Sequence, residues 1–272
     1  MYRQFCVTAL ACCRVHKVAF QIGNFAIYSY GVFVAFGFLI GLWTASRRGL
    51  RDGIAPEKIV DLGPWLILGT IVGARLWYVV SYWEKDFAGK PPWEMFMIRK
   101  GGLVFYGGLI GASLTCIGYL RLRRLPLWRL ADALAPSIAL GYFFGRFGCL
   151  LNGCCYGRPC SLPWAIHYPV EHETMGVGVH PTQVYDSLLN LALYAWLARV
   201  YPRKKFDGQV FALYLVGYAV ARFVVEIFRG DYPSYFAGWA TPAQLVSVGI
   251  LAVGLLLAWK LPKEKPAHAP RP

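Results

Sequence analysis

Long apolar stretches recur along the chain, separated by short polar connections. Phe25–Ser46, Gly101–Leu120 and Ala240–Trp259 contain no charged residue. A helix of roughly 20 apolar residues crosses a bilayer core about 30 Å thick. Four further windows meet this criterion with one or two charges each: Leu62–Trp83, Leu130–Asn152, Val184–Ala198 and Gln209–Phe228. The pattern predicts an all-α, polytopic integral membrane protein with about seven transmembrane helices.

Basic residues gather in alternate connections between these windows. The chain carries a net charge of +14, which by itself would suggest a nucleic-acid partner, but no single basic patch is formed. One set of connections holds Arg47, Arg48, Arg51, Lys58, Arg121, Arg123, Arg124, Arg129, Arg199, Arg203, Lys204, Lys205, Lys260, Lys263, Lys265 and Arg271. The positive-inside rule then places the C-terminus in the cytoplasm and the N-terminus outside. We therefore exclude nucleic acid as a partner and expect a multi-pass membrane protein.

The domain organisation follows from the same windows. We expect an N-terminal tail at residues 1–23 and a single transmembrane domain over residues 24–261. The longest connection, residues 153–183, lies on the outer side, and its Pro, Gly, His and Trp content suggests an ordered arm. The Pro-, Lys- and Ala-rich residues 262–272 predict a disordered cytoplasmic tail.

Charged residues inside the spans are candidates for function, because each costs roughly 2.5–3.5 kcal/mol at a helix centre. The predicted topology places six charged or phenolic residues of the spans in the outer half of the membrane: Arg75, Arg146, Arg222, Glu226, Tyr30 and Tyr106. Converging arginines favour an anionic ligand such as a phospholipid headgroup. An alternative is that Arg222 and Glu226, four residues apart, form an ion pair that only screens their own charges. Asp132 and Asp186 sit near helix ends, and we expect them to be N-terminal or interfacial charges.

Several local strings strengthen the lipid hypothesis. They are YSYG at Tyr28–Gly31, GARLWYV at Gly73–Val79, GGLVFYGGLIGA at Gly101–Ala112, GRFGCLLNGCCYGRP at Gly145–Pro159, HPTQVYD at His180–Asp186 and GYAVARFVVEIFRGDY at Gly217–Tyr232. In this order they resemble the bacterial prolipoprotein diacylglyceryl transferases, from about Tyr28 to Trp259. The glycine-rich string at residues 101–112 is weak alone, since small residues also let helices pack closely.

The resemblance implies transfer of the diacylglyceryl group of phosphatidylglycerol to the lipobox cysteine of a preprolipoprotein signal peptide, with loss of glycerol phosphate. The partners would be these two substrates and membrane lipids, and no metal or nucleotide cofactor is implied. Arg146 and Arg222 match arginines that engage the lipid phosphate. With Tyr106 and Tyr30 they are the candidate catalytic residues. The candidate substrate-binding residues are Arg75, Asn152, Gly157, Tyr218, Glu226, Arg229 and His180.

Three positions depart from the family pattern. Tyr106 stands where many members have a histidine that could serve as the base for the thiol, and Cys149 and Cys154 stand in place of Asn and Glu. A phenol with a pKa near 10 is a poor base unless cations lower it. We therefore expect phosphate binding to be retained and the thiol to be activated differently, by a Tyr106 phenolate or by electrostatics alone.

The cysteines of the outer arm leave several alternatives. Cys149, Cys154, Cys155 and Cys160 do not follow a standard zinc spacing. In an oxidising compartment disulfides are the first expectation, ahead of inert thiols and of metal or redox chemistry. His180, at the start of the fifth span, is expected to shape the arm, with a proton-shuttle role as the second possibility.

Competing functions follow from the same residues. The departures at Tyr106, Cys149 and Cys154 keep open a related transferase with another thiol or hydroxyl acceptor. An anion transporter would favour repeated halves and charges near the midplane, which this sequence does not display. The cysteine cluster alone suggests a thiol–disulfide oxidoreductase, but no C-x-x-C pair supports it.

Overall fold

The computed structural model describes residues 15–23, 25–97, 101–231 and 240–261. Most of these residues are helical, in seven long helices: α1 (Ser29–Arg51), α2 (Pro56–Ser81), α3 (Phe105–Arg123), α4 (Leu127–Asn152), α5 (Thr182–Val200), α6 (Gln209–Ile227) and α7 (Pro242–Lys260). Among the described residues, α1, α2, α4, α6 and α7 are long and apolar enough to cross a membrane. The fold is that of an α-helical, multi-pass membrane protein, and the count of seven spans stays a prediction.

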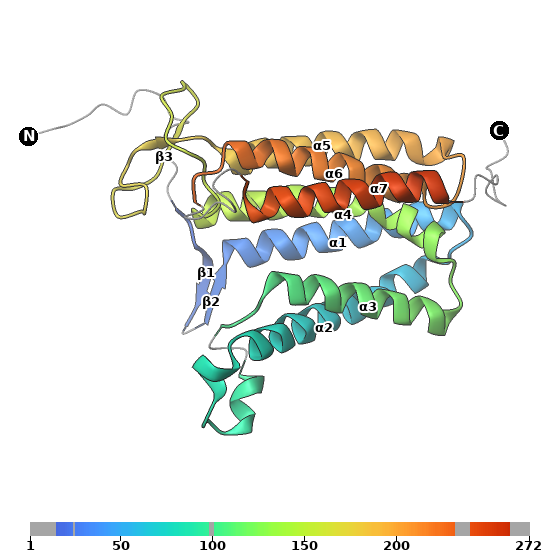
Figure 1. Cartoon of the computed structure of the whole chain (residues 1–272), viewed down its shortest axis with the longest axis horizontal. Helices are drawn as coiled ribbons and strands as arrows, with labels where there is room; N and C mark the ends of the chain where they lie inside the picture. The colour runs from blue at the N-terminus through green and yellow to red at the C-terminus, as the bar shows by residue number, and fades with distance from the viewer. Residues whose placement is uncertain (1–14, 24, 98–100, 232–239, 262–272) are drawn as a thin grey trace, which may run out of the picture. The chain divides into compact units, whose positions relative to one another are not determined.

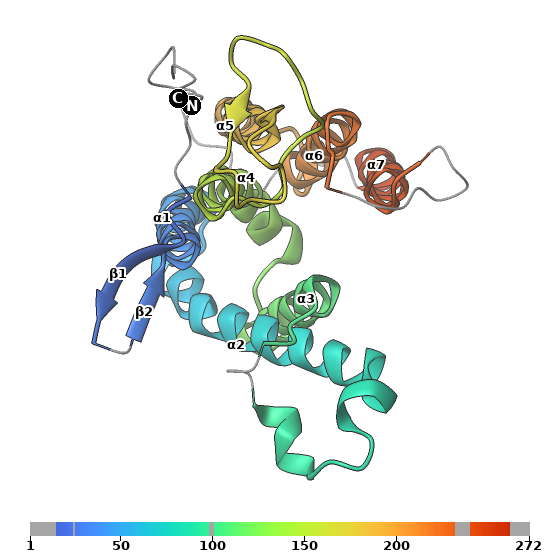
Figure 2. The same ribbon diagram turned by 90° about the vertical axis from the view of Figure 1, so that its left-hand side faces the viewer.

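The chain divides into two compact units, residues 1–45 with 131–272 and residues 46–130. In the first unit α4, α5, α6 and α7 lie side by side (Figure 1) and are seen end-on in Figure 2. Small residues of α4, namely Ala133, Ala135 and Ala139, pack against Leu193, Leu197, Val210 and Tyr214. Short side chains on α4 thus let α5 and α6 approach closely.

Polar groups fix the ends of these helices. Thr241 and Gln244 form a reciprocal capping box ahead of Pro242, which begins α7. The carboxylate of Asp132, fully buried, accepts hydrogen bonds from the backbone N–H groups of Gly208 (2.9 Å) and Phe211 (3.0 Å) and pairs with Lys204 at 3.1 Å. The first turn of α6 is therefore held by a charge on α4.

Two antiparallel hairpins interrupt the helical pattern. Strand β1 (Val18–Ile22) pairs with β2 (Phe25–Tyr28) immediately before α1. The predicted tail therefore contains a strand, and the first helix begins at Ser29 rather than Phe25. The residues between α4 and α5 carry β3 (Ile166–His167) and β4 (Gly178–Val179), with a small apolar cluster of Ile166, Tyr168 and Val179. The predicted arm thus contains a pair of short strands. Residues 1–14 of the predicted N-terminal tail and the predicted tail at 262–272 lie outside the described residues.

The second unit is built on a close helix pair. Gly69 and Gly73 of α2 face Gly107 and Gly111 of α3, and a Cβ on Gly73 would lie 2.4 Å from the Gly107 carbonyl oxygen. The glycine-rich string thus serves helix packing, whatever else it does. Between α2 and α3 lie the π-helical turn η1 (Trp83–Phe87) and the 3₁₀ turn η2 (Pro92–Phe96); a further 3₁₀ turn, η4 (Tyr201–Arg203), follows α5.

Candidate active site

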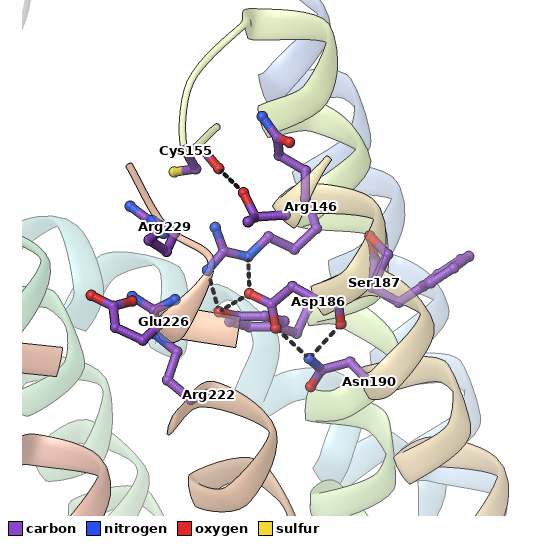
Figure 3. A network of polar contacts seen from close by, with 12 residues as sticks. Arg146, Cys155, Asp186, Ser187, Asn190, Arg222, Glu226 and Arg229 are labelled. Carbon is purple, nitrogen blue, oxygen red and sulfur yellow. Dashed lines mark hydrogen bonds and ion pairs between the residues drawn. The ribbon is translucent and has the colours of Figure 1, made fainter. Parts of the chain in front are cut away.

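Arg146 lies in the second half of α4, with its side chain 12% exposed. Its Nε lies 2.8 Å from Oδ2 of Asp186 on α5, and its Nη2 donates a hydrogen bond to the Tyr142 hydroxyl. The guanidinium also lies over the Tyr142 ring, 4.9 Å from its centroid. Figure 3 shows the Arg146 guanidinium directed at the Asp186 carboxylate. Arg146 is therefore held in a fixed orientation by groups from two helices.

Asp186 is the carboxylate that makes this arrangement possible. It is 1% exposed, and besides Arg146 it accepts hydrogen bonds from Tyr142 (3.2 Å) and from Asn190 Nδ2 (3.1 Å). Asp186 and Asp132 lie near the starts of α5 and α4, as expected, but they are not charges of the membrane interface: both are buried and ion-paired with another element. A buried carboxylate needs such partners because its desolvation cost is high.

The second arginine, Arg222 on α6, pairs with Glu226 one turn later. Its Nη2 lies 2.8 Å from Oε2 of Glu226, whose side chain is fully buried. The ion pair expected from the four-residue spacing therefore forms. This ion pair leaves one nitrogen of the guanidinium without a hydrogen bond. Nη1 of Arg222 is buried and has no hydrogen-bond partner among the described residues. That N–H group can donate to an additional anion.

Tyr218 on α6 is an electrostatic neighbour of both arginines. It lies one helical turn before Arg222, and its phenol interacts electrostatically with both Arg222 and Arg146. Its ring packs edge-on against Tyr142, with centroids 5.7 Å apart. Tyr30, the second residue of α1, lies next to Gly148 of α4, where an added Cβ would come within 3.1 Å of the Tyr30 ring. Its phenol is an electrostatic neighbour of Arg146 and of the arm cysteines.

Arg229 and Gly157 join the arm to the end of α6. Arg229, 7% exposed, forms a two-point pair with Asp231 at 2.7 and 2.8 Å, which holds the Arg229 pKa above its ordinary value despite burial. Gly157 forms a β-bridge with Arg229, and a Cβ there would lie 2.5 Å from Cβ of His180. Only glycine permits this approach, so the role of Gly157 in the described structure is close packing.

His180 behaves as the sequence analysis expects of a residue that shapes the arm. Its carbonyl oxygen accepts from the Gly157 N–H and its own N–H donates to the Arg158 carbonyl, both at 3.0 Å. Its ring lies against Phe228, with centroids 5.3 Å apart, and Nδ1 lies 3.3 Å from the Tyr185 hydroxyl. The proton-shuttle possibility stays untested.

The four cysteines in and next to the arm do not form the disulfides that were the first expectation. Cys149, Cys154, Cys155 and Cys160 are free thiols, so the predicted disulfides are absent among these residues. The sulfurs of Cys149, Cys154 and Cys155 all lie within 4.8 Å of one another. Hydrogen bonds from the other two thiols, with Arg146 and Arg229 nearby, lower the pKa of Cys155 below its usual value. Asn152, the last residue of α4, places Nδ2 3.5 Å from the Cys154 sulfur.

Arg75 and Tyr106 belong to the second unit. Arg75 donates to four backbone carbonyls, those of Met95 (2.6 Å), Glu94 (2.9 Å), Gly101 (2.8 Å) and Gly102 (3.1 Å). It thus holds the chain between α2 and α3, a structural role that its sequence position does not reveal. Tyr106 is the second residue of α3 and is 48% exposed. The predicted convergence of these two with Arg146 and Arg222 stays a prediction.

Two residues of this network were not among the candidates predicted from the sequence. Tyr142, one turn before Arg146, and Asn190, one turn after Asp186, complete the network around the Arg146–Asp186 pair. Both lie on the same helix face as a charged residue, four positions away. That spacing is the only sequence signal for them.

Comparison with known proteins identifies the family of this chain. The sequence model of the family described as prolipoprotein diacylglyceryl transferase matches residues 17–260. Relatives named phosphatidylglycerol–prolipoprotein diacylglyceryl transferase include one from Finegoldia magna, 37% identical over 91% of this chain and 96% of its own length. Others are from Bacillus cereus (37% identical, 89% of this chain and 91% of the relative) and Synechococcus elongatus (36%, 88% and 85%). The chain belongs to the prolipoprotein diacylglyceryl transferase family.

Proposed function

We propose that this protein transfers the diacylglyceryl group of phosphatidylglycerol to the cysteine thiol of a prolipoprotein and releases glycerol phosphate. The observation that carries the proposal, beyond family membership, is the pair of buried arginines on α4 and α6, each with a carboxylate partner. The site would face the outer leaflet of the cytoplasmic membrane, and the lipobox of the signal peptide would present the thiol there.

Arg146 and Arg222 bind the phosphate in this proposal. Planar guanidinium groups suit phosphate oxygens, and the unused Nη1 of Arg222 supports a role as donor. Their Asp186 and Glu226 partners hold the guanidiniums in place and offset their charge while no lipid is bound. Negative charge builds on the phosphate as it leaves, and preorganised cations stabilise that charge in a water-poor site.

The reaction is a displacement at a glyceryl carbon. The cysteine sulfur attacks as a thiolate, the carbon–oxygen bond to phosphate breaks, and its electron pair stays on the phosphate oxygen of glycerol phosphate. Tyr106 and Tyr30 are the proposed catalytic phenols, with Tyr106 as the base. The proposed substrate-binding residues are Arg75, Asn152, Gly157, Tyr218, Glu226, Arg229 and His180. Loss of transfer in a folded Tyr106→Phe variant supports this role; undiminished transfer contradicts it.

A related transferase with another acceptor is the second candidate. The observation that favours it is the departure from the family pattern at Cys149, an electrostatic neighbour of Arg146, and at Cys154. In that case the lipid site is retained and the acceptor differs.

The test is in vitro transfer by purified protein in detergent. Phosphatidylglycerol and a lipobox peptide are supplied, and the peptide mass is followed. We expect a gain of one diacylglyceryl unit on the cysteine, lost in Arg146→Gln and Arg222→Gln. Arg199→Gln is the matched control, since among the described residues the Arg199 side chain donates to a carbonyl of its own helix, that of Ala195. A peptide with serine for cysteine controls for the acceptor.

Either outcome is informative. Transfer that survives both arginine changes contradicts the phosphate role. Folded protein that modifies other thiols or hydroxyls but not the lipobox peptide favours the second candidate.

A further inference from the structure

Three cysteines at the end of α4 form a compact sulfur cluster. The sulfurs of Cys149, Cys154 and Cys155 lie within 4.8 Å of one another, and all three side chains are partly buried and free. A tetrahedral zinc ion holds each sulfur at about 2.3 Å, which sets sulfurs about 3.8 Å apart. The three thiols therefore need only small rotations to bind one ion together. The spacing along the chain does not signal this site, because the turn after α4 creates it.

The turn that gathers the sulfurs is held from several sides. Gly153 (φ +75°) and Cys155 (φ +64°) both adopt left-handed backbone conformations, and Cys154 N–H donates to the Cys149 carbonyl at 3.2 Å. Two side chains at the start of α5 hold the backbone carbonyl groups of the turn. Thr182 donates a hydrogen bond to the carbonyl of Cys155 (2.6 Å), and Gln183 donates one to the carbonyl of Cys154 (2.7 Å). A cysteine in a left-handed conformation is uncommon, and such residues concentrate at functional sites.

The surroundings suit a zinc–thiolate centre. Three thiolates and one Zn²⁺ carry a net charge of −1, and Arg146 and Arg229 are electrostatic neighbours of Cys155. Each guanidinium already has a carboxylate partner, Asp186 or Asp231, so neither opposes a cation as an isolated charge would. Figure 3 shows Cys155 next to Arg146 and Arg229, on the side of the site where the arm meets α4 and α6. The Asn152 amide lies within 3.5 Å of the Cys154 sulfur and can orient it.

We propose that Cys149, Cys154 and Cys155 bind one Zn²⁺, and that the substrate cysteine occupies its fourth position as a thiolate. Catalytic zinc sites keep three protein ligands and one open position, and a thiol that coordinates zinc loses its proton. This inference rests on the proposed diacylglyceryl transfer. Zinc then activates the thiol in place of the Tyr106 phenol, so wild-type transfer by a folded Tyr106→Phe variant favours zinc over that base.

The step balances without an oxidant or reductant. The substrate S–H proton passes to water on coordination. The zinc-bound sulfur attacks the glyceryl carbon, a carbon–sulfur bond forms, and the carbon–oxygen bond to phosphate breaks. The electron pair stays on the glycerol phosphate oxygen, beside Arg146 and Arg222. The thioether product is a weaker, neutral ligand, so it leaves the ion for the next thiolate.

The experiment uses the full-length protein, purified in detergent without chelator. Zinc is measured by elemental analysis in the wild type, in Cys149→Ser and Cys155→Ser, and in Cys160→Ser. Cys160 is the matched control because it is a free arm thiol outside the cluster. Cobalt(II) then replaces zinc, and its absorption spectrum is followed as the lipobox peptide or its serine analogue is added. Transfer is measured before and after reversible chelation.

We expect about one zinc per wild-type and Cys160→Ser chain, and a cobalt spectrum that shifts with the cysteine peptide alone. Transfer should fall roughly 10²–10⁴-fold on chelation or in the two cluster variants, the range that a general base contributes, and return with zinc. Full transfer by folded, metal-free protein overturns the catalytic zinc and leaves the proposed function standing. Zinc binding and the cobalt shift without transfer support the site and contradict the proposed function. No metal binding by folded wild type, or a disulfide within the cluster, overturns the site.

Discussion

Replacing Asp186 by asparagine removes the negative charge that orients Arg146 and changes little else. The side chain keeps its size, and Asn190 can still contact it, but the 2.8 Å ion pair with Arg146 Nε is lost. With Asp186 1% exposed and the Arg146 side chain 12% exposed, water cannot replace the missing carboxylate easily. The variant therefore tests whether the pair positions Arg146 for phosphate.

The magnitude follows from the burial of the pair. Removing one partner of a buried ion pair costs about 3–5 kcal/mol, because the other charge stays buried and uncompensated. Loss of one preorganised group that stabilises a developing anion lowers a rate about 10²–10³-fold, equivalent to about 2.7–4 kcal/mol. We expect Asp186→Asn to lower the stability of the protein in detergent and the transfer rate by amounts of this order.

The assay separates the two effects with a second variant and a control. In Arg146→Gln/Asp186→Asn the buried charges vanish together, so stability should recover towards wild type while transfer stays lost. Glu171→Gln is the control: the Glu171 side chain is exposed, and the loss of a surface charge costs about 0–1 kcal/mol. Heat-induced loss of monodisperse protein and the initial transfer rate are measured. An Asp186→Asn protein with wild-type stability and rate would refute the reasoning.

Three further substitutions test the packing. Gly157→Ala forces a Cβ to within 2.5 Å of that of His180, so we expect transfer to fall and stability to drop by about 1–3 kcal/mol, measured by heating. Gly107→Val places a Cβ 2.3 Å from that of Trp77, and the yield of monodisperse protein should fall as α2 and α3 are forced apart. Arg75→Gln deprives backbone carbonyls of their donor and should speed proteolytic cleavage between α2 and α3, which Arg75→Lys would restore only in part.

The sequence located much of the candidate site because charges in apolar spans stand out. Arg146, Arg222 and Glu226 were identifiable for this reason, and the four-residue spacing of Arg222 and Glu226 predicted their ion pair. Asp186 was identified as near a helix end, but the sequence did not show that it is buried and paired with Arg146. The partner of a buried charge lies on another helix, and no spacing along one chain reveals which.

The cysteines show the same difference between what the sequence predicts and what the tertiary structure decides. Their number and neighbourhood in the sequence favoured disulfides, whereas the turn after α4 leaves three free thiols within 4.8 Å of one another. That turn depends on left-handed residues and on carbonyl contacts from the start of α5, which follow from tertiary packing.

By itself the sequence determined that the protein is helical and lies in a membrane, because the bilayer imposes a length and polarity on each span that can be counted in residues. The sequence also identified the charged residues inside apolar spans, because burying a charge in a membrane costs free energy wherever it occurs. Only the tertiary structure decided the partners: Asp186 for Arg146, four backbone carbonyls for Arg75, and two thiols for Cys155. Pairing depends on the distance between helices in space, which the order of residues along a chain does not fix.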